Sequence, residues 1–281
     1  MWLRIIEMTA ALDQAMTDLR VGSDSVSLTK WKAWGLRPLV LFAAAYSLMT
    51  IFHEFAHALT AYAFRVPSTL FHFAVNIDRA HGTLNQRAVI GVAGPLFALG
   101  IGLLSWGAYT RTRNSRLKLP LLYFVMFGVG TFFGNLMSMA FVGDFSRLAL
   151  TLQLPMAVRY SASVLGMLLL CGLSFLIGME LRRWTPVGIS ATKAMMGMVA
   201  LPAILGTALV LLIFLPMPSN FAYARMAESS FWIVAAVGTL VSRKQPTDSK
   251  RKLDLGWTDI ALLLAAALLV RLVVSGITFM P

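Results

Sequence analysis

Charged residues are scarce in this 281-residue chain. They make up 13% of it, against about a quarter in a typical soluble domain, whereas 58% of the chain is hydrophobic. The scarcity excludes an ordinary soluble fold, and no stretch is long and polar enough to form a second domain. We therefore expect lipid to be the main solvent of this protein.

Cysteine and nucleic-acid motifs are also lacking. The single cysteine, Cys171, excludes an intrachain disulfide. There is no glycine-rich phosphate loop and no aromatic–basic RNA-binding pattern. The net charge of +12 arises from Lys and Arg in short loops between apolar runs, which favours a membrane surface as the partner. The expected partner is thus the lipid bilayer and not a nucleic acid, and no pattern indicates an oligomeric state.

Long apolar runs account for most of the chain. Seven occur, at about 38–64, 88–109, 120–142, 160–181, 195–215, 229–242 and 257–278. A membrane-spanning helix needs about 20 apolar residues, and the sixth run is short and directly follows Glu228, so six spans plus a re-entrant piece is the alternative to seven spans. The runs predict an all-α polytopic membrane protein with six to seven transmembrane helices.

Basic residues divide unequally between the two sets of loops. The N-terminal segment and alternate loops hold 17, and the opposite set holds 6. The positive-inside rule therefore places the N-terminal segment, residues 1–37, in the cytoplasm and the C-terminus outside. Residues 1–20 mix apolar and charged side chains, which predicts an amphipathic helix on the membrane surface. We expect an integral protein of a prokaryotic cell membrane.

The segment after the first apolar run has a different character. Thr69–Val75 favours β structure, Asp78–Gly82 supplies turn residues, and Thr83–Gln86 is predicted to return along the first strand. The pattern predicts a short β-hairpin-like segment after the first helix.

The strongest chemical signal is His53-Glu54-Phe55-Ala56-His57, within the first apolar run. Residues four apart share a helix face, so both imidazoles can reach one metal ion. Glu54 lies beside them, where its carboxylate can take a proton from a metal-bound water. Ionisable groups inside a membrane helix are costly and usually functional. The pattern predicts one zinc ion per chain, with a hydrogen-bonded structural cluster as the alternative.

A catalytic zinc ion needs a third protein ligand and an open position. We favour Asp144, because the first and third runs end on the same side of the membrane and so bring it level with the two histidines. The rivals are His72 and His81, in the hairpin segment. Asp144 has an alternative role as a helix cap or as a partner for Arg147.

Three motifs, in order, resemble the site-2 protease family of intramembrane metalloproteases. The first is the HExxH segment, followed by Ala58-Leu59. The second, Val92-Ala93-Gly94-Pro95-Leu96, is similar to the family's Gly-Pro motif. The third is Gly134-Asn135-Leu136 leading into Asp144-Phe145-Ser146-Arg147-Leu148, which resembles an Asn-Leu segment before Asp-Gly-Gly-Arg. The resemblance covers about residues 45–150.

The resemblance implies a three-helix metalloprotease core over residues 38–150, with accessory transmembrane helices in 151–281. His53, His57 and Asp144 would bind zinc, and Glu54 would be the catalytic base. The extended segment would present a strand edge, with Phe73 and Val75, to an unwound membrane-protein substrate. Asn135 would position the substrate or stabilise the oxyanion.

Two other functions remain open. A non-proteolytic scaffold or assembly factor that retains a zinc site is favoured by two departures from the family pattern: the usual Asn after Gly94-Pro95 is absent, and Phe145-Ser146 replaces Gly-Gly. A metal transporter is disfavoured, because the chain has few other acids within its apolar runs.

Overall fold

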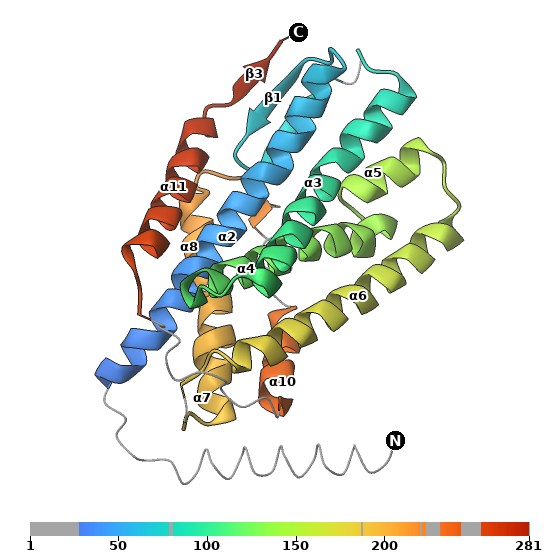
Figure 1. Cartoon of the computed structure of the whole chain (residues 1–281). Coiled ribbons are helices and arrows are strands. Elements are labelled where there is room, and N and C mark those ends of the chain that lie inside the picture. The colour runs from blue at the N-terminus through green and yellow to red at the C-terminus, as the bar shows by residue number, and fades with distance from the viewer. Residues whose placement is uncertain are drawn as a thin grey trace.

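A computed structural model describes residues 28–78, 81–186, 188–219, 221–222, 231–242 and 254–280. The amphipathic helix predicted over residues 1–20 lies outside these ranges. Figure 1 shows a bundle of helices with a small sheet at one end.

Five helices in the described ranges are long and apolar enough to cross a membrane. They confirm the prediction of an all-α polytopic membrane protein. Their bounds are α2 (Leu28–Ala63), α3 (Leu84–Arg111), α4 (Ser115–Met137), α6 (Met156–Arg182) and a composite helix made of α7 (Ala191–Met195), π-helical turns at Met196–Ala200 and Pro202–Gly206, and α8 (Thr207–Ile213).

The last two predicted runs contain shorter helices. In the sixth run, α10 (Trp232–Val241) has ten residues and is about 15 Å long, half the thickness of a bilayer core. In the seventh, α11 (Trp257–Val273) has 17 residues and is about 25 Å long. Two other short elements, the 3-10 turn η1 (Ser138–Ala140) and α5 (Asp144–Thr151), follow α4.

Helix α2 lies at the centre of the bundle, in contact with α3, α4, α8 and α11 (Figure 1). All side chains of Leu41–Thr50 are buried. This stretch is apolar nearly all round, as expected of a helix enclosed by others. The Phe42 ring anchors the centre through edge-on or tilted contacts with aromatic rings of α2, α4 and α10, at Tyr46, Tyr123, Phe127 and Trp232.

A buried ion pair joins α2 to α11. Arg37 Nε lies 2.8 Å from Asp259 Oδ2, and the two residues are only 2% and 3% exposed. Arg37 Nη2 also donates to the Arg116 carbonyl oxygen at the start of α4. Because an unpaired buried charge is strongly destabilising, this pair holds α11 against the N-terminal half of α2.

The predicted hairpin is present, but its turn lies elsewhere. Strand β1 (Ser68–Phe71) pairs antiparallel with β2 (Ala74–Ile77), and His72 and Phe73 form the turn. The prediction that Thr83–Gln86 returns along the first strand is wrong, whereas the His81 N–H donates to the Asp78 carbonyl oxygen, as the predicted turn requires. Thr83 and Gln86 instead form a capping box, in which each side chain bonds the other's backbone N–H, and this starts α3.

A third strand, β3 (Ile277–Phe279), pairs with the other edge of β1 and gives the order β2-β1-β3. The last apolar run was predicted to be helical to residue 278, but α11 ends at Val273, and Gly276 then adopts a φ of 84°. Pairing with β1 brings the end of α11 to the end of α2. The start of α2 and the C-terminal strand therefore lie at opposite ends of the bundle (Figure 1).

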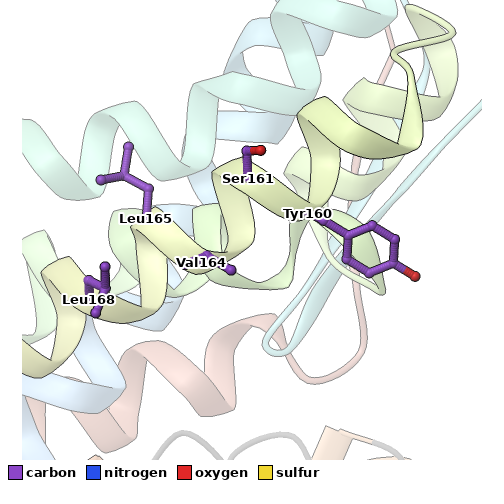
Figure 2. A pocket seen from close by; sticks show the side chains of 5 residues that line it. All are labelled: Tyr160, Ser161, Val164, Leu165 and Leu168. Atoms are coloured by element: carbon purple, nitrogen blue, oxygen red, sulfur yellow. The ribbon is translucent and has the colours of Figure 1, made fainter.

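A shallow hollow of about 420 Å³ lies over α6, lined by Tyr160, Ser161, Val164, Leu165 and Leu168 (Figure 2). Its lining is mainly aliphatic and contains no acid, base or nucleophile beyond two hydroxyl groups. The hollow fits a surface that faces lipid.

Candidate metal centre

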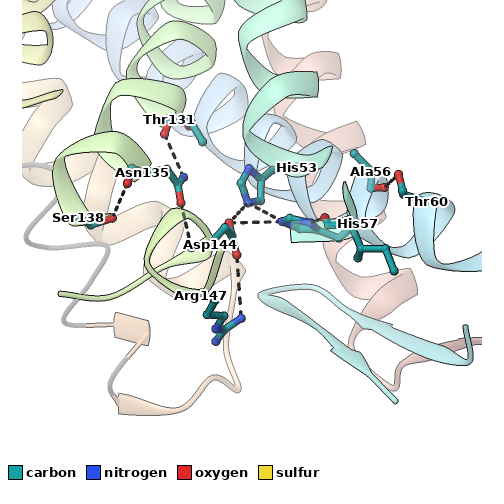
Figure 3. Close-up of polar contacts among 10 residues, drawn as sticks. His53, Ala56, His57, Thr60, Thr131, Asn135, Ser138, Asp144 and Arg147 are labelled. Atoms are coloured by element: carbon teal, nitrogen blue, oxygen red, sulfur yellow. Dashed lines mark hydrogen bonds and ion pairs between the residues drawn. The ribbon is translucent and has the colours of Figure 1, made fainter. Parts of the chain in front are cut away.

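Helix α2 places His53 and His57 one turn apart on a single face. Both are buried, with 8% and 5% of their surface exposed. Their Nε2 atoms lie 3.2 Å apart and point toward the same spot (Figure 3). The four-residue spacing predicted this arrangement.

Asp144 completes the cluster from a different element. It is the first residue of α5, and its Oδ2 lies 3.0 Å from His53 Nε2 and 3.4 Å from His57 Nε2. The preceding residue, Gly143, has a φ of 100°, a backbone conformation that glycine adopts readily. This turn directs α5 back toward α2, so the expected meeting of the three side chains occurs.

The two rival ligands lie apart from the cluster. His72 is buried in the hairpin turn, with Nε2 2.8 Å from the Phe214 carbonyl oxygen and 3.0 Å from that of Pro216. His81 is exposed and pairs with Asp78. Within the described ranges, His53, His57 and Asp144 are the one cluster of three such side chains.

The three ligand atoms lie within about 0.3 Å of the spacing in a zinc site. Four-coordinate zinc, with bonds of about 2.0–2.2 Å, separates its ligand atoms by roughly 3.3–3.6 Å. The observed separations are 3.0, 3.2 and 3.4 Å. Two imidazole nitrogens and one carboxylate oxygen are also a donor set found in catalytic zinc sites. These residues therefore fit the metal that the sequence predicts.

A backbone carbonyl of α3 orients one imidazole. His57 Nδ1 lies 2.6 Å from the Ile90 carbonyl oxygen, which can only accept a hydrogen bond. Nδ1 must then carry the proton, and the lone pair of Nε2 faces the cluster. Such outer partners fix the tautomer of metal-binding histidines. Sequence reasoning missed this contact, because a carbonyl carries no residue-specific signal. His53 Nδ1, in contrast, has no hydrogen-bond partner among the described residues.

Gly94 lets α3 pass directly over the two imidazoles. A Cβ atom at this position would lie 2.3 Å from His57 Nε2 and 2.8 Å from His53 Nε2. Any side chain would therefore occupy the space where the ligand atoms converge. The sequence singled out Gly94-Pro95 by resemblance alone, and the structure supplies a physical reason for the glycine.

Asn135 lies in the last turn of α4, beside the third ligand. Its Nδ2 donates to the Thr131 carbonyl oxygen at 3.0 Å, and its Oδ1 accepts the Asp144 backbone N–H at 3.2 Å (Figure 3). Its predicted role toward substrate stays a prediction, but its amide already has two partners within the protein.

The charge around Asp144 favours the ionised carboxylate. Burial alone would raise the pKa of Asp144, but hydrogen bonds from His53 and His57, and the positive charge of these imidazoles when Nε2 is protonated, hold that pKa well below its ordinary value. The carboxylate is thus ready to act as a ligand at any ordinary pH. Its other oxygen lies 4.0 Å from Arg147 Nη1, so the predicted pairing with Arg147 accompanies the cluster and does not replace it.

The remaining predicted residues lie in α2 and in the hairpin. Glu54 is half-buried and lies one turn before His57 on α2, the relation that brings two side chains to the same helix face. Val75 lies in β2, whereas Phe73 lies in the hairpin turn, with its ring 4.9 Å from that of Phe221. The predicted strand edge over 69–77 is therefore reduced to Ala74–Ile77.

Comparisons with known proteins give no relative: no family model, no curated protein and no solved structure matches this chain.

Proposed function

We propose that this protein is an intramembrane zinc metalloprotease that hydrolyses peptide bonds of membrane-spanning proteins. The observation that carries the proposal is the convergence of His53 Nε2, His57 Nε2 and Asp144 Oδ2 within 3.4 Å of one another. Two of the three lie in a helix long and apolar enough to cross the membrane. The resemblance of three motifs to site-2 proteases points to the same activity.

A zinc ion held by these three residues would polarise the scissile carbonyl and lower the pKa of a bound water to about 7. Glu54 would accept a proton from the attacking water and deliver it to the leaving amine. Ile90 would hold His57 in the required tautomer through its carbonyl oxygen. Each of these roles falls to a group that already lies at or beside the cluster.

Strand β2 is the best candidate for the edge that receives substrate. Among the described residues, only β1 pairs with it. A two-residue turn makes Phe71 and Ala74 a hydrogen-bonded pair, so the next pair, Leu70 and Val75, is not hydrogen-bonded. The N–H and C=O of Val75 therefore face away from β1, where an unwound segment of substrate can pair with them.

The position of β2 suits this role. Ile77, at its end, packs in one small cluster with Ile90 of α3. Ile90 carries the carbonyl that binds His57, so this end of β2 approaches the metal side of α2. The opposite strand, β3, lies on the other side of α2, where the Phe279 ring contacts Phe55 and Tyr62.

The unequal division of basic residues between the two sets of loops predicts which side of the membrane this site faces. With the N-terminus in the cytoplasm, α2 would run outward, and the metal cluster, near its C-terminal end, would lie toward the outer face of a prokaryotic cell membrane. The sheet and the C-terminal strand would lie on the same side.

The competing function is a scaffold that retains its metal. The observation that favours it is the fixed packing of α5, where the family pattern has two glycines. Phe145 is buried against Phe132, with ring centroids 5.4 Å apart, and Ser146 is buried as well. This packing stiffens the segment that carries the third ligand.

Metal removal separates a zinc protease from a scaffold. We expect the purified protein, reconstituted in liposomes with single-span membrane proteins, to cleave at least one of them. Treatment with 1,10-phenanthroline should abolish cleavage, and added zinc should restore it, since the bound water depends on the metal. Full activity after the chelator, with zinc shown to be absent, would contradict the proposal.

The Val75→Pro variant tests whether substrate pairs with the outward edge of β2. Proline removes an outward-facing N–H and is tolerated on edge strands, so the hairpin should persist. Because a net hydrogen bond contributes about 0.5–1.5 kcal/mol, we expect kcat/KM to fall by roughly 2- to 10-fold, with zinc content unchanged. Val75→Ala keeps the N–H and serves as the control. Equal rates for the Pro and Ala variants would argue against this edge.

A further inference from the structure

We propose that Asn135 is a positioning residue for the third metal ligand and does not contact substrate. The inference rests on the proposed metal site at His53, His57 and Asp144. It assigns the amide a role in holding α5, and it differs from the role in substrate positioning or oxyanion stabilisation that the resemblance implies.

Asn135 caps α5 from outside that helix. Asp144 is the first residue of α5, so its backbone N–H has no acceptor within the helix. The N-cap position is Gly143, which has no side chain to fill this need. Asn135 Oδ1, on α4, accepts the Asp144 N–H at 3.2 Å and thereby performs the task of a capping side chain.

The orientation of the Asn135 amide follows from its two partners. The Thr131 carbonyl can only accept, so the group 3.0 Å away must be the NH₂. The Asp144 N–H can only donate, so it must meet the amide oxygen. A flipped amide would make both contacts repulsive. The oxygen cannot stabilise an oxyanion, and one of the two N–H groups of the amide is occupied by Thr131.

The turn between α4 and α5 closes tightly around the same residue. Ser138 Oγ donates to the Asn135 carbonyl oxygen at 3.1 Å. A Cβ on Gly143 would lie 3.3 Å from Asn135 Oδ1 and 3.0 Å from Ser138 Oγ. Asn135 therefore contacts the turn at both its start and its end, and this fixes where the Asp144 carboxylate meets the two imidazoles.

Loss of the amide should weaken metal binding. Partners that orient a metal ligand typically contribute 10- to 100-fold in affinity. Asn135→Leu keeps similar size and removes both hydrogen bonds. Gly134→Ala changes the neighbouring position, where an added Cβ meets nothing within 4 Å, and is the matched control.

The experiment measures the zinc dissociation constant of the purified full-length protein by competition with a chromophoric chelator. We expect about 10- to 100-fold weaker binding for Asn135→Leu and no change for Gly134→Ala. At saturating zinc, the Leu variant should recover cleavage with an unchanged KM. Circular dichroism and gel filtration establish that each variant is folded.

Three other outcomes are distinguishable. Wild-type affinity for zinc in a folded Asn135→Leu variant would overturn the inference, and a raised KM in the same variant would assign Asn135 to substrate. If the wild-type protein itself fails to bind zinc, the proposed metal site is wrong, and the inference about Asn135 falls with it.

Discussion

The Glu54→Gln variant is expected to fold and to bind zinc, yet to cleave membrane substrates about 10²–10⁴ times more slowly than the wild-type protein. Gln keeps the size and much of the hydrogen bonding of Glu but cannot accept a proton. Glu54 lies beside His57 in a helix of low dielectric, where a carboxylate without a catalytic role is costly. The measurement is kcat/KM on a reconstituted single-span substrate, with zinc content determined on the same sample.

The control neutralises a carboxylate remote from the cluster. Glu180, near the end of α6, hydrogen-bonds Tyr109 and pairs with Arg183 2.9 Å away. Glu180→Gln should leave cleavage unchanged, whereas Glu54→Gln should nearly abolish it. If Glu54→Gln cleaves the substrate at the wild-type rate, Glu54 is not the catalytic base. If the wild-type protein itself cleaves none of the reconstituted substrates, the scaffold function replaces proteolysis.

The Gly94→Ala variant is expected to lose zinc and cleavage together. Its new Cβ would lie 2.3 Å from His57 Nε2, far inside van der Waals contact, so α3 or the imidazole must move. Either movement separates the three ligand atoms. We expect the loss of zinc affinity to exceed the 10- to 100-fold that disturbing an outer partner typically costs. Competition with a chelator measures the affinity, and gel filtration establishes folding.

The matched control for this variant lies on the same helix. A Cβ added at Gly100 meets nothing within 4 Å, and alanine is the better helix former. Gly100→Ala should therefore keep both zinc and activity. Wild-type zinc affinity in a folded Gly94→Ala protein would show that α3 does not approach the ligands as described.

Two ligands of the site were predictable from local rules, and the third required topology. Four-residue spacing on a helix fixes His53 and His57 to one face whatever the rest of the fold. Asp144 followed from an argument about membrane level: the first and third apolar runs end on the same side. The structure brings Asp144 to the two histidines, whereas the side of the membrane on which they lie stays a prediction.

Contacts made by the backbone were not predictable. Ile90 acts through its carbonyl, and the Asp144 N–H acts through an amide of another helix. Neither contact has a signature in residue type. The hairpin turn was misplaced for a related reason: Asp78–Gly82 has typical turn residues, but the capping box of Thr83 and Gln86 begins the next helix at once and leaves no residues for a returning strand.

The C-terminal strand β3 shows how tertiary pairing overrides local composition. Residues 277–279 follow an apolar run without a break in hydropathy, yet they pair with β1, more than 200 residues earlier in the sequence. Only the assembled bundle brings that strand edge within reach.

The zinc content of the purified protein tests the central claim most directly. Elemental analysis should give about one zinc ion per chain for the wild-type protein and almost none for the His53→Ala, His57→Ala double variant. His72→Ala, which removes a buried histidine outside the cluster, should keep its zinc. Zinc retained at one ion per chain in the folded double variant would contradict the account, because the metal would then be bound elsewhere.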